Sequence, residues 1–422
     1  MSQDEKDSVI GEKQDMPLPP DGGSEGWSVV FGAACGLFAI YGVNYSWGVF
    51  LAYYSSTVYP GHMTQLSWVG SICIGFFFIL GPINDWVTRF MGYRYMLLFA
   101  MVVGPFALMM ASLTNAIWQL YLSQGLLFGI SASFVWFSCI GSVQQHFTTK
   151  RGLALGATLF GSGVGGLVMT NINVAVMQSL GYRWALRITG FICFVFLGVA
   201  ATLVKPFPGY QASLAANPTS TLKKHQNLVR KLDFCLLLAV AFITTFGYLV
   251  PSFMLPSYAK SLKLNPWVGA NLSAIINAVN AVAKPFMGYL GDRVGRLNVF
   301  FICTFMAGIM CLAVWTNAHT EAAVWAFAVL YGIFGCGYLT MLATVVPQIA
   351  GYEAISEANG LLYFLNLPGY LVGSPVASAI INTSDPPNYR YAAVYAGLLL
   401  CVGGLFAFAL RIAHGGWNCH RI

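Results

Sequence analysis

Long apolar stretches dominate this chain, and they constrain its fold more than any other feature. A bilayer-spanning helix needs about 20 mostly apolar residues. The sequence contains twelve such stretches, at roughly 30–53, 66–84, 95–113, 117–141, 153–178, 184–204, 232–256, 266–290, 298–316, 322–346, 357–381 and 391–412. Only 8% of residues are charged, against about 25% in soluble domains. The sequence therefore predicts an all-α membrane protein with twelve transmembrane helices and excludes an ordinary soluble globule.

The longest polar break separates six spans from the other six. It is basic and has two prolines near its start. The predicted units are a disordered N-terminal tail at 1–26, a six-helix half at 27–204, a linker at 205–231, a second six-helix half at 232–412 and a short tail at 413–422.

The basic residues predict the orientation. With a cytoplasmic N-terminus, fifteen of the 21 Lys and Arg residues fall on the inside, five on the outside and one within a span. Because positive residues favour the cytoplasmic side, we expect both termini to be cytoplasmic. The net charge of +7 then reflects topology, so no nucleic-acid partner is expected. We expect the plasma membrane, with the vacuole or another internal membrane as the alternative. Membrane lipid is an expected partner. A monomer would suffice, and the oligomeric state stays open.

A short repeat relates the two halves. A Gly, an Asp and an Arg at four-residue spacing follow spans 2 and 8, at Gly81, Asp85 and Arg89 and at Gly288, Asp292 and Arg296. All three pairs share one offset of 207 residues, which is close to half of the 422-residue chain. Two six-span halves related by a parallel repeat are typical of secondary transporters, whose substrate site lies near the midplane between the halves.

These loops resemble the G-x-x-x-D-x-x-G-R signature of the major facilitator superfamily. The second copy is intact, and the first has Thr88 where a glycine is usual. The resemblance implies the major facilitator fold and transport by alternating access. It also implies that acids and bases at these helix ends form a gate, for which the candidates are Asp85, Arg89, Asp292, Arg293 and Arg296. The alternative is that they are solvated topology charges.

A narrower resemblance is to monocarboxylate-porter-like transporters of the fungal type. Asp21-Gly22-Gly23 before Trp27 is similar to the entry of that family's first span. The run from His146 to Gly165 is similar to its entry into span 5, and the segment from Asn277 to Arg296 is similar to its span 8. This resemblance implies a small organic anion as the substrate.

Lys284 is the only charged residue deep inside any predicted span, and no Asp or Glu is expected at the same depth to pair with it. A charge at bilayer depth costs several kcal/mol and marks a functional site by default. Ser273, Asn277 and Asn280 share its helix face. This polar stripe predicts an anion site built from Lys284, Asn280 and Asn277. The alternative is a hydrogen-bonded helix contact, with Lys284 snorkelling toward the cytoplasm.

Proton coupling stays open at this point. The resemblance implies an Asp and an Arg four residues apart in span 8 of animal relatives, whereas this chain has Asn280 and Lys284. Lys284 could exchange the proton itself, the substrate could carry it, or transport could be facilitated. No cofactor and no metal are expected.

Two further stripes could line the opposite wall of the site. In span 11, Tyr363 and Asn366 share a face, with Pro368 next to it as a potential hinge. In span 1, Tyr41 and Asn44 share a face. We predict that these four side chains bind substrate. Ordinary packing between helices is the alternative.

The sequence thus favours a transporter of small organic anions. Export of an acidic fungal secondary metabolite and uptake of a riboflavin-like vitamin are the alternatives within the same class. A nutrient sensor is less favoured, because sensors of this fold usually add a long cytoplasmic tail. An enzyme is not expected, since no span holds a His cluster, a nucleophile elbow or paired carboxylates. Asn382 begins a glycosylation sequon.

Overall fold

The computed structural model describes residues 21–60, 62–207, 228–264, 266–381 and 388–415. Within these ranges the regular structure is helical and no strand is present, which confirms the all-α prediction. Ten stretches of the described residues are long and apolar enough to cross a membrane, judged by length and composition. The other two predicted spans correspond to α3, which has 17 residues, and to α13, which carries Lys284 and the asparagines of the polar stripe.

The first half contains six long helical segments. They are α2 (Gly23–Tyr53), α3 (Met63–Ile79), α4 (Asn84–Ser112), α5 with η3 and α6 (Ile117–Leu120, Tyr121–Leu127 and Phe128–His146), α7 (Arg151–Leu180) and α8 (Tyr182–Leu203). A short 3₁₀ turn, η2 (Gly81–Ile83), joins α3 to α4. Inside α4, Gly92 has φ 71° and breaks the helix.

The second half repeats this plan. Its helices are α11 (Leu232–Tyr248), α12 (Val250–Ser261), α13 (Pro266–Val294), α14 with η4 and η5 (Arg296–Ile309, Met310–Val314 and Trp315–Asn317), α15 (Glu321–Ala350), α16 (Ile355–Leu365), α17 (Leu367–Ile381) and α18 (Tyr389–Gly415). A 3₁₀ turn, η6 (Tyr352–Ala354), precedes α16.

Two predicted spans are broken where proline follows. The span predicted at 232–256 divides between α11 and α12, just before Pro251, and the span predicted at 357–381 divides at Asn366, just before Pro368. Proline has no N–H to continue the helical ladder, which explains both breaks. The helix α2 begins at Gly23, four residues before the predicted start of the first half at 27.

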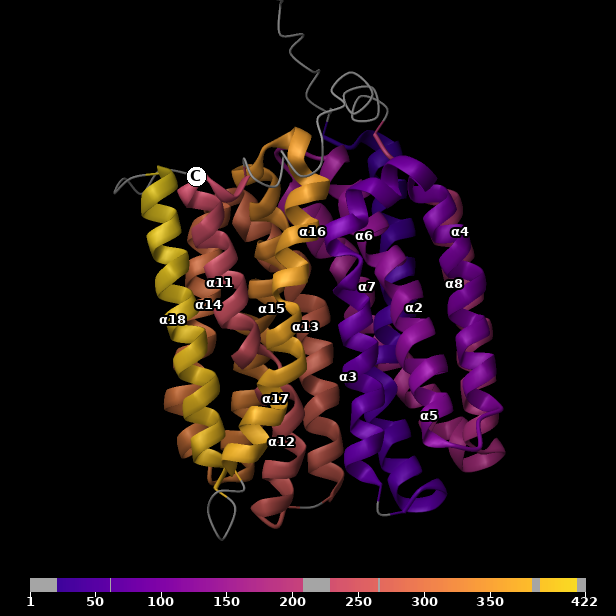
Figure 1. Ribbon diagram of the computed structural model, residues 1–422. Coiled ribbons are helices and arrows are strands. Elements are labelled where there is room, and N and C mark those ends of the chain that lie inside the picture. Colours follow the sequence, from indigo (N-terminus) through magenta and orange to yellow (C-terminus); the bar gives the residue numbers. More distant parts are fainter. Residues whose placement is uncertain (1–20, 61, 208–227, 265, 382–387, 416–422) are drawn as a thin grey trace, which may run out of the picture.

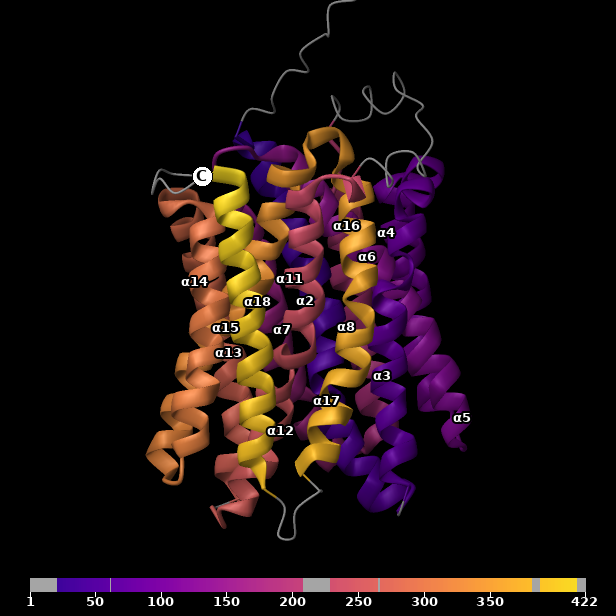
Figure 2. The same cartoon turned by 60° about the vertical axis from the view of Figure 1, so that its left-hand side comes forward.

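The two halves lie side by side, as Figure 1 shows with the indigo-to-magenta helices next to the orange-to-yellow ones. We call one end of the bundle the linker face. There α2 begins, α8 ends at Leu203, α11 begins at Leu232 and α18 ends at Gly415. Figure 2 shows the same arrangement after a 60° turn.

Two seams join the halves. In the first, α7 packs along α13, and in the second, α3 and η2 pack against α17 and α16. The largest apolar cluster runs through the first half and continues into α15 and α16 of the second half. The candidate site lies along these two seams.

Candidate functional site

Lys284 lies in the first seam and is 2% exposed. Its Nζ donates a hydrogen bond to Oγ of Ser162, at 2.8 Å. Ser162 lies on α7, in the other half, and is fully buried. Lys284 therefore joins the halves and does not snorkel toward an aqueous face. Among the described residues, no Asp or Glu forms an ion pair with it.

Glycines let α7 and α13 approach so closely. A Cβ at Gly156 would lie 2.5 Å from the carbonyl oxygen of Lys284, and one at Gly163 would lie 2.5 Å from Cβ of Ala281. Gly161 and Gly165 instead face α2, where added Cβ atoms would meet the carbonyls of Ala34 and Phe38. The glycine-rich span therefore serves close packing on two faces, as small residues do between membrane helices.

The rest of the α13 stripe is less buried than Lys284. Asn277 and Asn280 are half-buried. The Asn280 amide donates to the Ile276 carbonyl at 2.9 Å, while its Oδ1 is buried and accepts no hydrogen bond from the described residues. The side chain of Ser273 is outside the described part of the chain. Asn280 thus offers an unused acceptor one helical turn from Lys284.

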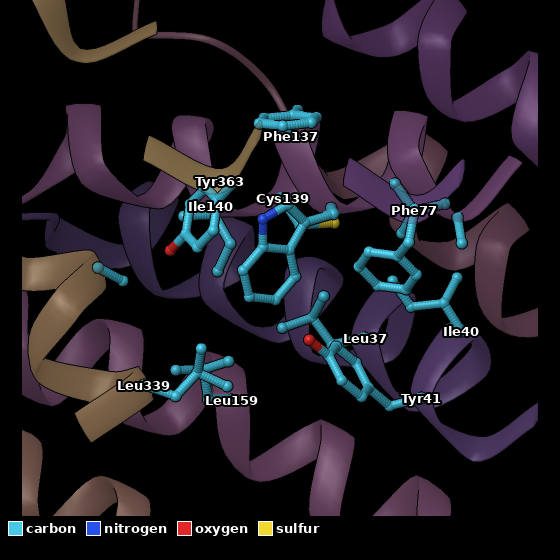
Figure 3. Close-up of a cluster of buried hydrophobic side chains, with 14 of the residues drawn as sticks. Leu37, Ile40, Tyr41, Phe77, Phe137, Cys139, Ile140, Leu159, Leu339 and Tyr363 are labelled. Atoms are coloured by element: carbon cyan, nitrogen blue, oxygen red, sulfur yellow. The ribbon is translucent and has the colours of Figure 1, made fainter. Parts of the chain in front are cut away.

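Aromatic side chains from both halves meet in the second seam. The Tyr363 ring stacks on Phe78 at 5.6 Å and lies edge-on to Trp136 at 5.2 Å between ring centroids. Tyr370 stacks on Phe78 at 5.3 Å. Tyr41 lies edge-on to Trp136 at 5.8 Å. Figure 3 shows Tyr41 and Tyr363 converging here, with Leu159 and Leu339 next to them. We call Tyr41, Phe78, Trp136, Tyr363 and Tyr370 the aromatic cluster.

Several buried polar atoms around this cluster have no hydrogen-bond partner among the described residues. They are Nε1 of Trp136, Oη of Tyr363 and both amide atoms of Asn366. Asn366 is completely buried and lies at the break between α16 and α17. Buried polar groups are nearly always satisfied, so this concentration marks Asn366 and Tyr363 as functional candidates. Asn44 is half-buried on α2, one turn from Tyr41.

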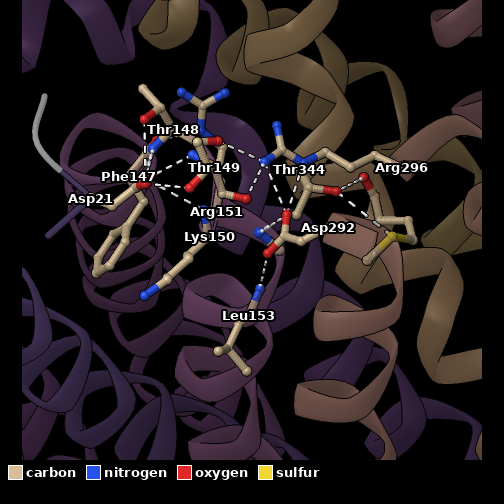
Figure 4. Close-up of polar contacts among 12 residues, drawn as sticks. Asp21, Phe147, Thr148, Thr149, Lys150, Arg151, Leu153, Asp292, Arg296 and Thr344 are labelled. Carbon is tan, nitrogen blue, oxygen red and sulfur yellow. Dashed lines mark hydrogen bonds and ion pairs between the residues drawn. The ribbon is translucent and has the colours of Figure 1, made fainter. Parts of the chain in front are cut away.

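At the linker face, a carboxylate joins the two halves across the first seam. The two oxygens of Asp292 accept from the backbone N–H groups of Gly152 and Leu153, each at 2.9 Å. These N–H groups open α7, so Asp292 caps that helix from the other half. Arg296 donates to Asp292 from Nη2 at 2.9 Å and to the carbonyl of Thr148 at 2.7 Å. Figure 4 shows this network.

The second seam has its own polar contacts at the same face. Asn84 donates to the Ser356 hydroxyl at 3.0 Å, and Arg89 lies 3.6 Å from Glu357. Asn359 donates to Gln144 at 2.5 Å, which again joins the halves. The side chain of Asp85 is outside the described part of the chain.

Arg293 lies apart from both seams. It is exposed, and its guanidinium lies over the ring of Tyr289, 5.3 Å from the centroid. Adjacent residues on a helix point about 100° apart, so Arg293 cannot share the direction of Asp292. The structure does not bring Arg293 into the described contacts of Asp292 and Arg296.

Asp21 extends the linker-face network to the start of the first helix. Its carboxylate accepts from the N–H groups of Thr148, Thr149 and Lys150 and from both threonine hydroxyls. Burial raises the pKa of Asp21, but the hydrogen bonds from Thr149 and Thr148 together outweigh it and hold the pKa well below its usual value. Gly22 has φ 76°, and a Cβ there would lie 2.3 Å from the Phe147 ring. The Asp-Gly-Gly motif thus packs against the loop that precedes α7.

Ser162, Trp136 and Asp21 were not predicted as site residues. Ser162 carried a usable signal, because a hydroxyl between two glycines inside a span indicates a polar contact at close helix approach. Trp136 carried none. No group of three potential metal ligands occurs among the described residues. Asn382, the predicted glycosylation site, lies outside the described residues.

The family comparison agrees with this arrangement of two halves. The model of the Major Facilitator Superfamily matches residues 29–281 and 268–417. The chain belongs to the Major Facilitator Superfamily. It is therefore a multi-pass membrane transporter of this superfamily. The first resemblance given by the repeated Gly, Asp and Arg positions is confirmed.

Relatives and solved structures extend this assignment. The MFS transporter asaE of Aspergillus flavus is 29% identical over 417 residues, covering 98% of this chain and 92% of that protein. The aspyridones efflux protein apdF of Emericella nidulans is 28% identical over 396 residues, covering 93% of this chain and 79% of that protein. The proton:xylose symporter XylE has a TM-score of 0.76 at 12% identity, covering 92% of this chain and 96% of that chain. This last likeness concerns the fold alone.

Proposed function

We propose that this transporter carries small organic anions by alternating access and that the Lys284 ammonium binds their negative charge. The observation that carries the proposal is the position of Lys284, which is 2% exposed and lies in the seam between the halves. A buried ammonium without a carboxylate partner favours an anionic ligand, because the charge would otherwise stay uncompensated.

Other polar and aromatic groups along the two seams suit the rest of such a substrate. The unused Oδ1 of Asn280 accepts a hydrogen bond from a donor on the ligand. Asn277 and Asn44 are half-buried and add polar contacts. The aromatic cluster, including Tyr41 and Tyr363, offers ring faces to an apolar or aromatic body. A carboxylate attached to such a body fits this composition, as the monocarboxylate-porter-like motifs suggest.

The linker-face contacts of Asp292 and Arg296 support a gate in the first seam, because the bonds from Gly152 and Leu153 exist only while the halves are close there. We assign the corresponding gating role in the second seam to Arg89 and Asp85. In this proposal α13 carries both functions on different residues, with Lys284 binding substrate and Asp292 gating.

Export of an acidic secondary metabolite is the more specific candidate. Relatives along nearly the whole chain include efflux proteins named for aspyridones and for fujikurins. We propose the plasma membrane as the site of action, with both termini in the cytoplasm. Lys284 has no carboxylate nearby on α13, so any coupled proton would travel on Lys284 itself or on the substrate.

Untargeted profiling of small acids tests the proposal in cells with and without the protein, at two external pH values. Lys284→Gln should abolish the movement of any acid that the protein redistributes, while Lys284→Arg should retain part of it because the charge remains. Lys205→Gln is the matched control, since Lys205 is exposed at the linker face. Transport that survives Lys284→Gln would remove the anion-site proposal.

A further inference from the structure

Ser162 is oriented to accept a hydrogen bond from Lys284. Its hydroxyl donates its single proton to the carbonyl of Leu159, at 2.6 Å. Only the lone pairs of Oγ remain, and one of them accepts from Nζ of Lys284 at 2.8 Å. Both side chains are buried. The serine therefore acts as a neutral ligand of the ammonium, fixed by its own helix.

A neutral ligand leaves the ammonium poorly compensated. An ammonium has three donor hydrogens, and the described hydrogen bonds use one of them. A hydrogen bond with charge on both partners is roughly twice as strong as one between neutral groups. An anionic oxygen that reaches Lys284 would therefore bind the ammonium more strongly than the Ser162 hydroxyl does.

The helix packing leaves no space for both ligands. On α7, Gly156 and Gly163 flank Ser162 in sequence, and each lies so close to α13 that an added Cβ would be 2.5 Å from an atom of that helix. Ser162 is 0% exposed and Lys284 is 2% exposed, so no solvent-sized gap adjoins their contact. An oxygen inserted between Nζ and Oγ requires α7 and α13 to separate at this level.

We propose that Ser162 is a positioning residue for transport, holding Lys284 while no substrate is bound, and that an anionic oxygen of the substrate takes its place. Substrate binding then removes a hydrogen bond between the halves. This inference rests on the proposed function, and it adds a requirement to it. An anion releases the first seam, whereas a neutral analogue of the same shape leaves Ser162 on Lys284.

The release would reach the linker face through α13. Lys284 and Asp292 are eight residues apart on this helix, which is about 12 Å along its axis. Asp292 caps α7 from the same side of the seam. Because both contacts join α13 to α7, losing the inner one weakens the attachment that the outer one maintains.

The test needs no ligand. Thr344 is completely buried on α15, next to Ala343, whose carbonyl accepts a hydrogen bond from Gln144 of the other half. Thr344→Cys therefore reports opening at the linker face through its reaction with a maleimide. Labelling is read from the peptide that contains residue 344, because the chain has ten native cysteines. The full-length purified protein carrying this reporter is compared with and without Ser162→Ala. Thr158→Ala is the matched control, because Thr158 is equally buried on α7 and donates to its own helix at the Ala154 carbonyl.

We expect Ser162→Ala to raise the labelling rate about tenfold or more, as the loss of one hydrogen bond to a charged group implies. Thr158→Ala should leave it unchanged. Lys284→Met should raise the labelling rate by a similar factor. The double variant should label no faster than either single variant, because both changes remove the same hydrogen bond. Equal rates for Ser162→Ala and Thr158→Ala would overturn the proposal, and so would additive effects.

The two proposals fail separately. If Lys284→Gln leaves acid transport intact while Ser162→Ala raises labelling, the anion function fails and the seam contact stands. If Lys284→Gln abolishes transport while Ser162→Ala labels like its control, the function stands and the exchange at Ser162 is wrong.

Discussion

Replacing Asp292 by asparagine should open the linker face. The carboxylate accepts two backbone hydrogen bonds from the start of α7 and two from Arg296. Asparagine keeps one acceptor oxygen and turns an NH₂ group toward a donor, so one capping bond is lost, worth about 1 kcal/mol. The lost charge removes about 1–2 kcal/mol more from the interactions with Arg296 and with the positive end of α7.

The sum is about 2–3 kcal/mol, which corresponds to roughly a 30- to 150-fold shift in the equilibrium between closed and open linker faces. The Thr344→Cys reporter measures it as a rise in maleimide labelling. Arg293→Gln is the control, because this neighbouring charge is exposed and lies over Tyr289. The reasoning is refuted if Asp292→Asn labels no faster than Arg293→Gln.

Three other changes test separate features. Gly288→Ala should open the first seam and slow transport, because its Cβ would lie 2.0 Å from the carbonyl oxygen of Gly152. Gly198→Ala is the control: its Cβ would meet its nearest atom at 3.6 Å, and both the labelling rate and transport should stay unchanged. Asn366→Leu should raise the free energy of unfolding by about 1–3 kcal/mol by removing unpartnered buried atoms while reducing transport; a lower melting temperature would contradict this. Asp21→Asn should lower the melting temperature, and the difference should be constant above about pH 4 and shrink only below it, since a depressed pKa gives stability that is lost as the pH falls through the folded value. A difference that grows with acidity would contradict the assignment.

The membrane spans were predictable because length and hydropathy are local properties. The Pro368 break was foreseeable as a hinge, since proline removes a donor from the helical ladder, although Pro285 and Pro347 lie inside continuous helices. Lys284 stood out because a buried charge is costly in any fold. Each of these predictions depends only on the residues within a single helix.

Contacts between the halves were not predictable in the same way. Ser162 and Lys284 are 122 residues apart. No local sequence pattern specifies the axial position of α7 against α13. Asp21 reaches Thr148 across 127 residues, so its role depends on where the first helix starts against that loop. The direction of Arg293 also differs from that of Asp292, because adjacent residues on a helix point about 100° apart.

The glycine contacts of the two seams have a consequence for how this chain can diversify. Gly152 meets Gly288 in one seam and Gly81 meets Gly360 in the other, backbone against backbone, with an added Cβ within 2.0–2.3 Å of the opposite carbonyl in each case. At these points the two halves meet through main-chain atoms. Substitutions elsewhere in the sequence do not change the chemistry of these contacts. Trp136, Tyr363 and Asn366 lie outside these contacts. Under the proposed function, their replacement alters which substrate is bound and leaves these main-chain contacts unchanged, so the same fold can serve substrates of different shape.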